Sequence, residues 1–339
     1  MASHSNLSGF DSISEQNTDL NRTYPKLTQK HVFSLKNNPM CGVTFYQWFF
    51  IGFKRLRYVE IKYIPRFLFI TAISFFNSIS ACIEYLLFER HIRQVKLPTD
   101  PVFIIGHPRT GTTLIHNLLA SDTENFYFCN TFCAGFPSCF LWFEPWGKKL
   151  FSGVIEKTRP MDAMPLHFEL PQEDECAVNL LSMGKSYYMP LWFMSQETQF
   201  RRYLDFSEED GGCKADEDAW VSAFLYLMRK LTLRNQRAEG LAVTRKRLLI
   251  KSPIHTARVP LLRRLFPAAS FLYVHRDPFE VYQSAVHMAD TAYWFFSLNT
   301  QSDEQVNDFI LWQFERMWAK YDAAARAPAP PAPAPTAPA

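Results

Sequence analysis

The sequence predicts an α/β fold in which helices flank a parallel sheet. An apolar strand at Phe103–Ile105 is followed by a glycine-containing turn and a helix from Thr113 to Ala120. Farther along, strand and helix patterns alternate at 247–250, 256–266, 270–274 and 279–288, and a last helix is expected at about 303–325. Successive strand–helix–strand units build a parallel sheet with right-handed crossovers. At 339 residues the chain is long enough for such a domain with an insertion or an appendage.

Composition divides the chain into four parts, 1–38, 39–97, 98–326 and 327–339. The first part is rich in Ser, Asn, Thr and Gln and is predicted to be disordered. The second is aromatic with helical periodicity. The third is the α/β domain, with a helical insertion at about 122–235 that is most clearly helical from Ala219 to Arg234. The last part has six Pro and six Ala in 13 residues, which predicts an extended or disordered tail.

The region 39–97 contains an apolar helical face. Apolar residues recur along it at spacings of three and four: Leu68, Ala72, Phe75, Ile79, Cys82 and Leu86. The uncharged run from Phe67 to Ile83 is 17 residues long, slightly shorter than the about 20 apolar residues that a membrane span needs. Basic residues precede this run, as in helices that lie in a membrane interface: Lys54, Arg55, Arg57, Lys62 and Arg66. Contact with a membrane surface and packing as a layer on the main domain both remain open.

Charge and cysteine content exclude several classes of partner. The 36 basic and 33 acidic residues leave a net charge of +3, far below the positive excess of duplex-binding proteins, so no nucleic acid partner is expected. The seven Cys lack zinc-ligand spacing and are predicted to be buried free thiols. The first 40 residues are polar and lack the start of a signal peptide. We therefore expect an intracellular protein, membrane-associated if residues 41–95 contact lipid.

A phosphate-binding loop is predicted between the first strand and the first helix of the domain. The segment 106–113, Gly-His-Pro-Arg-Thr-Gly-Thr-Thr, has GxxxxG spacing. Glycines let a backbone approach an anion, and the unpaired N–H groups of the following helix point at it. A Walker A loop would carry Lys where Thr112 stands, whereas here the cation is Arg109. The sequence therefore predicts a P-loop-like sheet that holds phosphate groups without the lysine of an ATPase.

A second anion site is predicted where the strand at 270–274 ends. Arg276 follows this strand at its carboxyl end, the edge where open α/β sheets bind ligands, and Ser284 lies eight residues later in the next helix. Arg can hold a phosphate through two hydrogen bonds, and Ser can add a hydroxyl donor. Alone, Arg-Asp-Pro is equally consistent with an ion pair beside a proline at the first helical position. Combined with the loop, it predicts a ligand with two separated phosphate groups.

Together these two sites resemble those of the sulfotransferases, which use 3′-phosphoadenosine 5′-phosphosulfate (PAPS). Residues 108–113 are similar to the family's 5′-phosphosulfate loop, and Arg276 and Ser284 match its 3′-phosphate residues, including their spacing. The segments 171–175, 249–255 and 265–267 extend the resemblance, which covers about 98–322. These features are similar to the branch nearer to tyrosylprotein and bacterial lipid sulfotransferases than to the small cytosolic enzymes.

The resemblance implies roles for the site residues. PAPS would be bound by the loop residues Arg109, Thr110, Gly111, Thr112 and Thr113 together with Arg276 and Ser284. Arg109 and Lys251 would stabilise the transferring sulfuryl group and the leaving phosphate, because charge increases there in the transition state. The alternative for Lys251 is a solvated cation at a strand end. The chemistry requires no metal, and none is expected.

The general base is less clear from the sequence. In the tyrosylprotein enzymes a Glu lies about 21 residues after the loop Arg, a register that places Asn130 here, and an amide cannot accept the proton. His255 is the first candidate, because it follows the Lys251 strand and His titrates near neutrality. Glu173 or Glu175 is the second, although acids in a first helical turn also simply complement the dipole. His167 is a weaker candidate, and His255 could equally be a histidine satisfied by backbone groups.

The acceptor predicted by this resemblance is the hydroxyl of an apolar, small-molecule or lipid-like compound. Aromatic residues of the insertion suit an apolar groove, although they suit a core as well: Phe136, Phe140, Trp142, Phe143 and Trp146. One departure is that the chain passes into Ala and Pro after Arg326, where the family continues with a segment that covers the nucleotide. The competing hypotheses are therefore a non-catalytic nucleotide-binding or membrane-scaffold relative and, disfavoured by Thr112, a P-loop kinase.

Overall fold

Four parallel strands form the centre of the structure, a computed structural model that describes residues 25–28 and 31–327. The strands are β1 (Val102–Ile105), β2 (Phe126–Phe128), β3 (Arg247–Lys251) and β4 (Ser270–Tyr273). They lie in the order β2-β3-β1-β4, and each neighbouring pair is parallel. The predicted parallel α/β sheet is confirmed. Strand β2 is an addition, because it lies inside the insertion predicted to be helical, and its three residues are too few to show a recognisable period.

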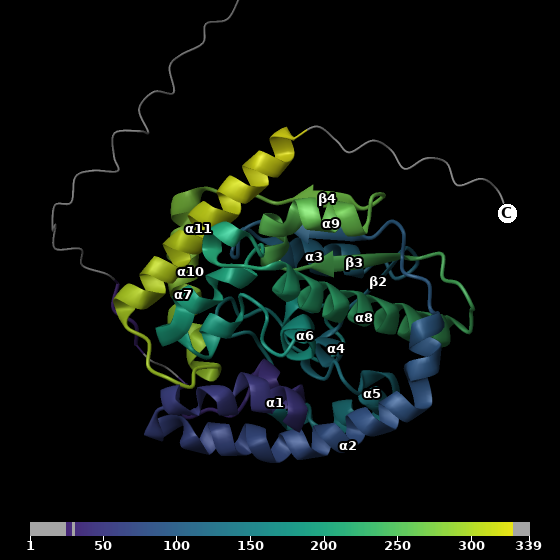
Figure 1. The fold of residues 1–339 in the computed structure, drawn as a ribbon, viewed down its shortest axis with the longest axis horizontal. Helices are drawn as coiled ribbons and strands as arrows, with labels where there is room; N and C mark the ends of the chain where they lie inside the picture. The colour runs from purple at the N-terminus through teal and green to yellow at the C-terminus, as the bar shows by residue number, and fades with distance from the viewer. Residues whose placement is uncertain (1–24, 29–30, 328–339) are drawn as a thin grey trace, which may run out of the picture.

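Helices cover the sheet and extend well beyond it (Figure 1). Those of the α/β unit are α3 (Thr112–Ala120), α8 (Lys214–Glu239), α9 (Val259–Leu265), α10 (Pro278–Ala292) and α11 (Asp303–Arg326). Those of the N-terminal region and of the insertion are α1 (Phe45–Ile51), α2 (Ile64–Gln94), α4 (Thr131–Gly135), α5 (Phe140–Leu150), α6 (Asp174–Leu181) and α7 (Glu197–Phe200). The helix predicted at 256–266 is divided: a 3₁₀ turn at Pro253–Arg258 precedes α9. Pro260 explains the division, since proline lacks the N–H of a helix interior and is tolerated in a first turn.

Part of the segment predicted as a polar lead lies against the domain. The ring of His31 stacks on Phe295 with 4.5 Å between centroids. Arg66 of α2 donates hydrogen bonds to the main-chain oxygens of Val32 and Ser34. The rest of the lead up to residue 24, positions 29–30 and the tail from residue 328 lie outside the described residues.

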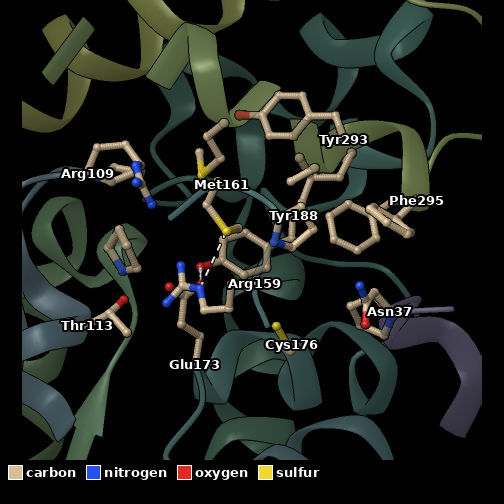
Figure 2. A pocket seen from close by; sticks show the side chains of 18 of the residues that line it. Asn37, Arg109, Thr113, Arg159, Met161, Glu173, Cys176, Tyr188, Tyr293 and Phe295 are labelled. Carbon is tan, nitrogen blue, oxygen red and sulfur yellow. Dashed lines mark hydrogen bonds between the residues drawn. The ribbon is translucent and has the colours of Figure 1, made fainter. Parts of the chain in front are cut away.

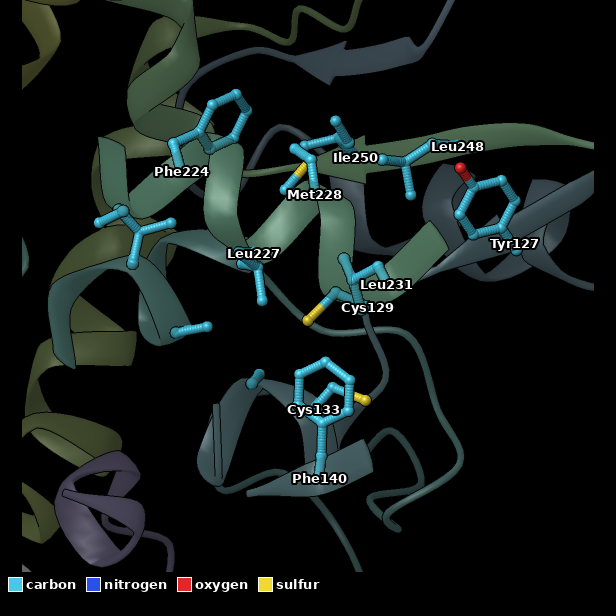
Figure 3. Packing of buried hydrophobic residues seen from close by; sticks show 14 of the residues in the cluster. Tyr127, Cys129, Cys133, Phe140, Phe224, Leu227, Met228, Leu231, Leu248 and Ile250 are labelled. Carbon is cyan, nitrogen blue, oxygen red and sulfur yellow. The ribbon is translucent and has the colours of Figure 1, made fainter. Parts of the chain in front are cut away.

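The main core lies between α8 and the sheet (Figure 3). Leu227, Met228 and Leu231 of α8 belong to the same buried cluster as Leu248 and Ile250 of β3. Four of the seven thiols are buried here or beside it, as predicted: Cys41, Cys129, Cys133 and Cys139. Burial raises the pKa of two of them, Cys41 and Cys133, to about 12, so they remain protonated. Two others, Cys82 and Cys213, are exposed, which differs from the prediction.

The long helix α2 crosses the molecule along one edge, beneath α1 in the view of Figure 1. By length and composition, the segment Ile61–Gln94 could cross a membrane, with a mean hydropathy of 1.6 and 33% of its apolar window buried. Its predicted apolar face points outward: Leu68, Ile79 and Leu86 are exposed. The buried side carries polar residues instead, including Asn77 and Glu84. A helical period identifies a face, but it does not say whether that face meets protein or solvent.

Candidate active site

The loop after β1 has a backbone conformation that suits phosphate binding. Gly106 and Gly111 have φ angles of 145° and 101°, in the region that favours glycine. A Cβ at Gly106 would lie 2.3 Å from the main-chain oxygen of Val274. Gly111 caps α3, so the free N–H groups of the first helical turn face the loop. Arg109 also has a positive φ, 77°, which turns its side chain out of the regular path of the loop.

A cavity of about 220 Å³ lies beside this loop (Figure 2). Figure 2 shows Arg109, Thr113 and Glu173 on one side of the cavity and Asn37 and Phe295 on the other. The remaining wall is largely apolar and aromatic: Pro39, Met161, Leu166, Tyr187, Leu191, Trp192, Tyr293, Phe296 and Phe309. A small charged cluster therefore faces an apolar chamber, which is the usual composition of a small-molecule site.

The charged cluster is centred on the pair formed by Lys251 and Glu173. Lys251 ends β3, and its Nζ lies 2.7 Å from Oε1 of Glu173 and 3.3 Å from Oγ1 of Thr113 in the loop. The hydroxyl of Tyr188 donates to the other oxygen of Glu173. The Lys251 side chain is almost fully buried, whereas that of Glu173 is 23% exposed. The alternative of a solvated strand-end cation does not describe Lys251.

The environment of Glu173 keeps its carboxylate ionised. Burial raises its pKa, but the Lys251 ammonium, together with hydrogen bonds from Lys251 and Tyr188, outweighs this and holds the pKa below its usual range. Burial and the neighbouring Glu173 raise the pKa of Tyr188 well above its usual range. Tyr188 therefore stays protonated and can donate to Glu173 throughout the neutral range.

Arg109 connects the loop to two other segments. Its Nε donates to Oγ of Ser284 at 3.0 Å, and its NH1 lies 3.1 Å from Oδ2 of Asp162. Arg159 approaches the same Asp162 oxygen at 3.4 Å and lines the cavity. The structure thus brings the predicted Arg109 and Ser284 together. It also adds Arg159, Asp162 and Tyr188, which the sequence does not indicate because their part of the insertion has no recognisable motif or period.

Arg276 lies at the solvent-exposed side of this region. Its Nε is 2.6 Å from Oε2 of Glu280, one helical turn later, and both side chains are about half exposed. Asp277 caps α10 by accepting from the N–H groups of Phe279 and Glu280, with Pro278 at the first helical position. The ion pair and the proline position considered as an alternative are both present. Neither Arg276 nor Ser284 lines the cavity beside Glu173.

His255, the first candidate for the base, lies behind the cavity wall. Its side chain is 0% exposed, and its Nε2 is 2.8 Å from Oδ2 of Asp174. The rings of Phe103, Trp220 and Phe224 surround it, and it is not a lining residue. This placement gives an acceptor no direct route to the imidazole, because the ring is fully buried and does not border the cavity.

The side chains of Glu175 and Asn130 also have their partners away from the cavity. Glu175 is fully buried and forms an ion pair of 2.9 Å with Arg258. Asn130 caps α4 by accepting from the N–H of Cys133 and donates to Glu144. Asn130 also forms an isolated bridge with Pro171. Asn130, which stands where the family Glu is expected, therefore lies beside Pro171, and Glu173 follows Pro171 by two residues.

The described residues contain one close group of metal-ligand types, and protein partners already engage it. Carboxylate oxygens of Asp174 and Glu175 and a ring nitrogen of His255 lie within 4.8 Å of one another. Asp174 accepts from Ser252 and faces His255. Glu175 accepts from Ser186, Trp220 and Arg258: this is the bonding of a neutralised core network.

The fold and the site together define an α/β protein with a glycine-containing loop after β1, next to a Lys–Glu pair and an apolar chamber. Residues 101–333 match the sulfotransferase family, and the chain belongs to that family. Two solved structures share its fold. The mycobacterial sulfotransferase STF1 from Mycobacterium tuberculosis has a TM-score of 0.54 at 13% identity, covering 83% of this chain and 74% of that one. STF9 from Mycobacterium avium has a TM-score of 0.50 at 16% identity, covering 73% and 60%.

Two curated relatives of the chain are also mycobacterial sulfotransferases. The omega-hydroxy-beta-dihydromenaquinone-9 sulfotransferases Stf3 of Mycobacterium bovis and Mycobacterium tuberculosis are each 28% identical to it over 263 residues. The matched part is 76% of this chain and 63% of each relative. The chain thus matches less than two thirds of the length of these relatives.

Proposed function

We propose that the protein transfers a sulfuryl group from PAPS to the hydroxyl of an apolar, lipid-like acceptor, with Glu173 as the general base. The observation that carries this proposal is that Glu173 lines an aromatic cavity directly beside the loop 106–113, while the buried Lys251 ammonium lies behind it, 2.7 Å from its carboxylate. A carboxylate that is ionised and partly accessible can accept a proton, whereas the enclosed His255 cannot be reached.

In this proposal each residue acts on a defined atom. The acceptor oxygen forms a bond to sulfur while the bond between sulfur and the bridging phosphate oxygen breaks. The hydroxyl proton passes to Glu173, and PAP leaves with the electron pair of the broken bond. Lys251 and Arg109 stabilise the oxygens that gain charge, in a site where part of the water is excluded. Tyr188 holds the Glu173 carboxylate in place.

The nucleotide would be held by the loop and by the start of α10. The N–H groups at the start of α3 and the side chains of Thr112 and Thr113 fit the 5′-phosphosulfate. Ser284 and Arg276 fit the 3′-phosphate, and Arg276 would exchange Glu280 for it. Because Ser284 already contacts Arg109, one short stretch of surface can contact both phosphate groups of the ligand.

An apolar acceptor fits the composition of the chamber. Trp192, Tyr293, Phe295 and Phe309 supply aromatic surface. The relative Stf3 is named for a menaquinone-derived compound with an omega-hydroxyl. Of the five aromatic residues that suggest a groove in the sequence, Phe136 lines an adjoining cavity, while Phe140 and Phe143 are core residues. The remaining two lie elsewhere: Trp142 is half-buried and bonded to α2, and Trp146 is exposed.

The binding half of the proposal is tested by thermal shift with PAP and with ATP plus Mg²⁺. Stabilisation by PAP alone supports a sulfotransferase site, whereas stabilisation by ATP plus Mg²⁺ alone supports a kinase. The change Arg276→Ala should weaken PAP binding. The control Arg93→Ala removes another exposed Arg, one that pairs with Glu89 at the same helical spacing, and it should leave PAP affinity unchanged.

The catalytic half is tested by transfer of labelled sulfate from PAPS to a lipid extract. Labelled lipid that forms with the wild type but not with Glu173→Gln supports the hypothesis that the protein is an enzyme. PAP binding without any transfer, across a range of extracts and hydroxylated lipids, would support the non-catalytic relative instead.

A further inference from the structure

The outward side of α2 is apolar along most of its length. From residue 64 to residue 87, every exposed residue is uncharged. We call this set the outer face of α2: Ile64, Pro65, Leu68, Ala72, Phe75, Phe76, Ile79, Cys82, Tyr85, Leu86 and Leu87. Several are more than half exposed, including Ile79 at 64% and Leu86 at 82%. Soluble proteins seldom expose a continuous apolar surface of this extent without a partner for it.

The inward side of α2 is mostly polar, with five polar residues among its eight buried ones, the reverse of an ordinary surface helix. Asn77 donates to the main-chain oxygens of Cys41 and Val43 at 2.6 and 3.0 Å. Glu84 forms a buried ion pair with Lys230 of α8 and accepts from the N–H of Leu141. These contacts hold α2 against the rest of the protein and fix its rotation about its own axis, so that the outer face points away. They also oppose a spanning position, because detaching α2 would leave Glu84 and Lys230 without their partners.

Charge around the N-terminal end of α2 is mainly positive. Between residues 44 and 88 there are five basic and two acidic residues, and one of the acids is the buried Glu84. Lys54 and Arg57 are exposed, with Lys54 Nζ 4.2 Å from the centre of the Phe50 ring. Lys62 is half-buried, with its Nζ 3.8 Å from Glu60 and 5.1 Å from the centre of the Tyr63 ring. Cations next to aromatic and aliphatic side chains are typical of helices that bind anionic lipid surfaces.

An apolar path connects this surface to the candidate active site. A second cavity, of about 90 Å³, shares five lining residues with the first, including Cys176 and Leu166. It reaches Phe136, whose ring stacks on Phe151 at 4.8 Å. Phe151 in turn contacts Phe76 of the outer face at 6.2 Å between centroids. Apolar side chains therefore continue from the chamber beside Glu173 to the outside of α2.

We propose that the outer face of α2 lies in one leaflet of a bilayer containing anionic lipids, with α2 parallel to the membrane plane and Lys54, Arg57 and Lys62 at the headgroups. The membrane contact stands independently of the activity. Its consequence for catalysis, which rests on the proposed function, is that a lipid acceptor approaches Glu173 along these apolar side chains, whose packed rings must move apart to admit it.

The contact is tested by flotation of the full chain with vesicles of phosphatidylcholine, alone or with 30% phosphatidylglycerol as a roughly physiological anionic fraction. We expect binding that increases with phosphatidylglycerol. The triple change Leu68→Ser, Ile79→Ser and Leu86→Ser should weaken it by about tenfold or more, because interfacial affinity scales with the apolar area inserted. The control triple Leu118→Ser, Val243→Ser and Leu311→Ser removes exposed apolar residues elsewhere and should leave binding unchanged.

Four outcomes would overturn the proposal. The first is no flotation with either vesicle, and the second is an equal loss in the control triple. The third is a wild-type dimer in detergent-free solution that becomes monomeric in the α2 triple without any vesicle binding, which would assign the face to a second copy of the chain. Resistance to alkaline carbonate extraction would also overturn it, in favour of a spanning helix.

A matched pair of assays separates this proposal from the proposed function. The α2 triple should keep its PAP thermal shift and its turnover of a detergent-dispersed acceptor, and it should lose at least about tenfold in transfer to the same acceptor in vesicles. If the wild type binds vesicles but transfers no sulfuryl group, the membrane contact is supported and the proposed enzymatic function is contradicted. If the wild type and the α2 triple transfer equally well to an acceptor in vesicles, the acceptor does not reach Glu173 along the apolar path.

Discussion

Three neighbouring ion pairs join the start of α6 to the end of β3 and the turn that follows it, and only one of them faces the cavity. The pairs are Glu173–Lys251, Asp174–His255 and Glu175–Arg258. The Glu173 side chain is 23% exposed, whereas those of Asp174 and Glu175 are 1% and 0% exposed. Residue type and chain position are nearly the same in all three, so the difference lies in what surrounds them.

The cavity pair borders open space that an external ligand can occupy, while the two core pairs are enclosed by protein. Within the described residues the Glu173 carboxylate is hydrogen-bonded to Lys251 and Tyr188 alone, and both Glu173 and Tyr188 border open space. Glu175 accepts hydrogen bonds from three different side chains and is enclosed. Buried charges that are fully bonded serve the specificity of the fold, and breaking one costs stability. We therefore expect changes in the first pair to affect turnover and changes in the other two to affect folding.

The largest effect is expected for Glu173→Gln. Replacing the carboxylate by an amide keeps the size of the side chain but removes the base, so transfer should fall by roughly 10²–10⁴-fold. PAP affinity should change little, whereas the melting temperature should fall, because the amide leaves the buried Lys251 ammonium without its carboxylate. The exposed Glu169→Gln, four residues earlier, is the control. Turnover within about twofold of wild type would remove Glu173 from the mechanism.

A loss of stability of about 3–5 kcal/mol is expected for Arg258→Met, because it leaves the Glu175 charge buried without its cation. Urea denaturation measures the change in the free energy of unfolding. The double change Glu175→Met with Arg258→Met should recover part of the loss, since no charge remains. A single variant as stable as wild type would contradict the core role of this pair.

A smaller effect, about 1–3 kcal/mol of stability, is expected for His255→Gln, which weakens one buried hydrogen-bonded contact with Asp174. Turnover per folded molecule, measured with PAP-binding sites counted by titration, should stay within about threefold of wild type. If turnover instead falls by 10²-fold or more while the fold is intact, His255 is the base after all.

The smallest effect is expected on the pH dependence of stability. The pKa of Asp174 is lowered: burial opposes this, but the positive charge of His255 and the hydrogen bonds from His255 and Ser252 outweigh it. A lowered folded-state pKa contributes stability above the unfolded value of about 4, and this contribution is lost as the pH falls through the folded value. The melting temperature should therefore be steady above about pH 5 and decline below about pH 4. In Asp174→Asn the decline should be shallower, and an unchanged slope would contradict this origin.

Much of the fold could be predicted because its signals are local. Short apolar strands, the glycines of the loop and the α10 start at Asp277-Pro278 each depend on a few adjacent residues. The orientation of α2 could not be predicted, since its inward side is determined by partners such as Lys230, 146 positions away from Glu84. Tyr188, Arg159 and Asp162 were missed for the same reason.

The sequence by itself determined the anion loop at 106–113, the Arg276 and Ser284 spacing and membership of the sulfotransferase family, because these depend on residues close together in the chain. Only the tertiary structure decided which of three adjacent acids faces the cavity and that His255 is enclosed. Access to a ligand depends on side chains that distant segments bring into place. The proton acceptor we propose is consequently Glu173, and the packing of Phe103, Trp220 and Phe224 around His255 is the physical reason.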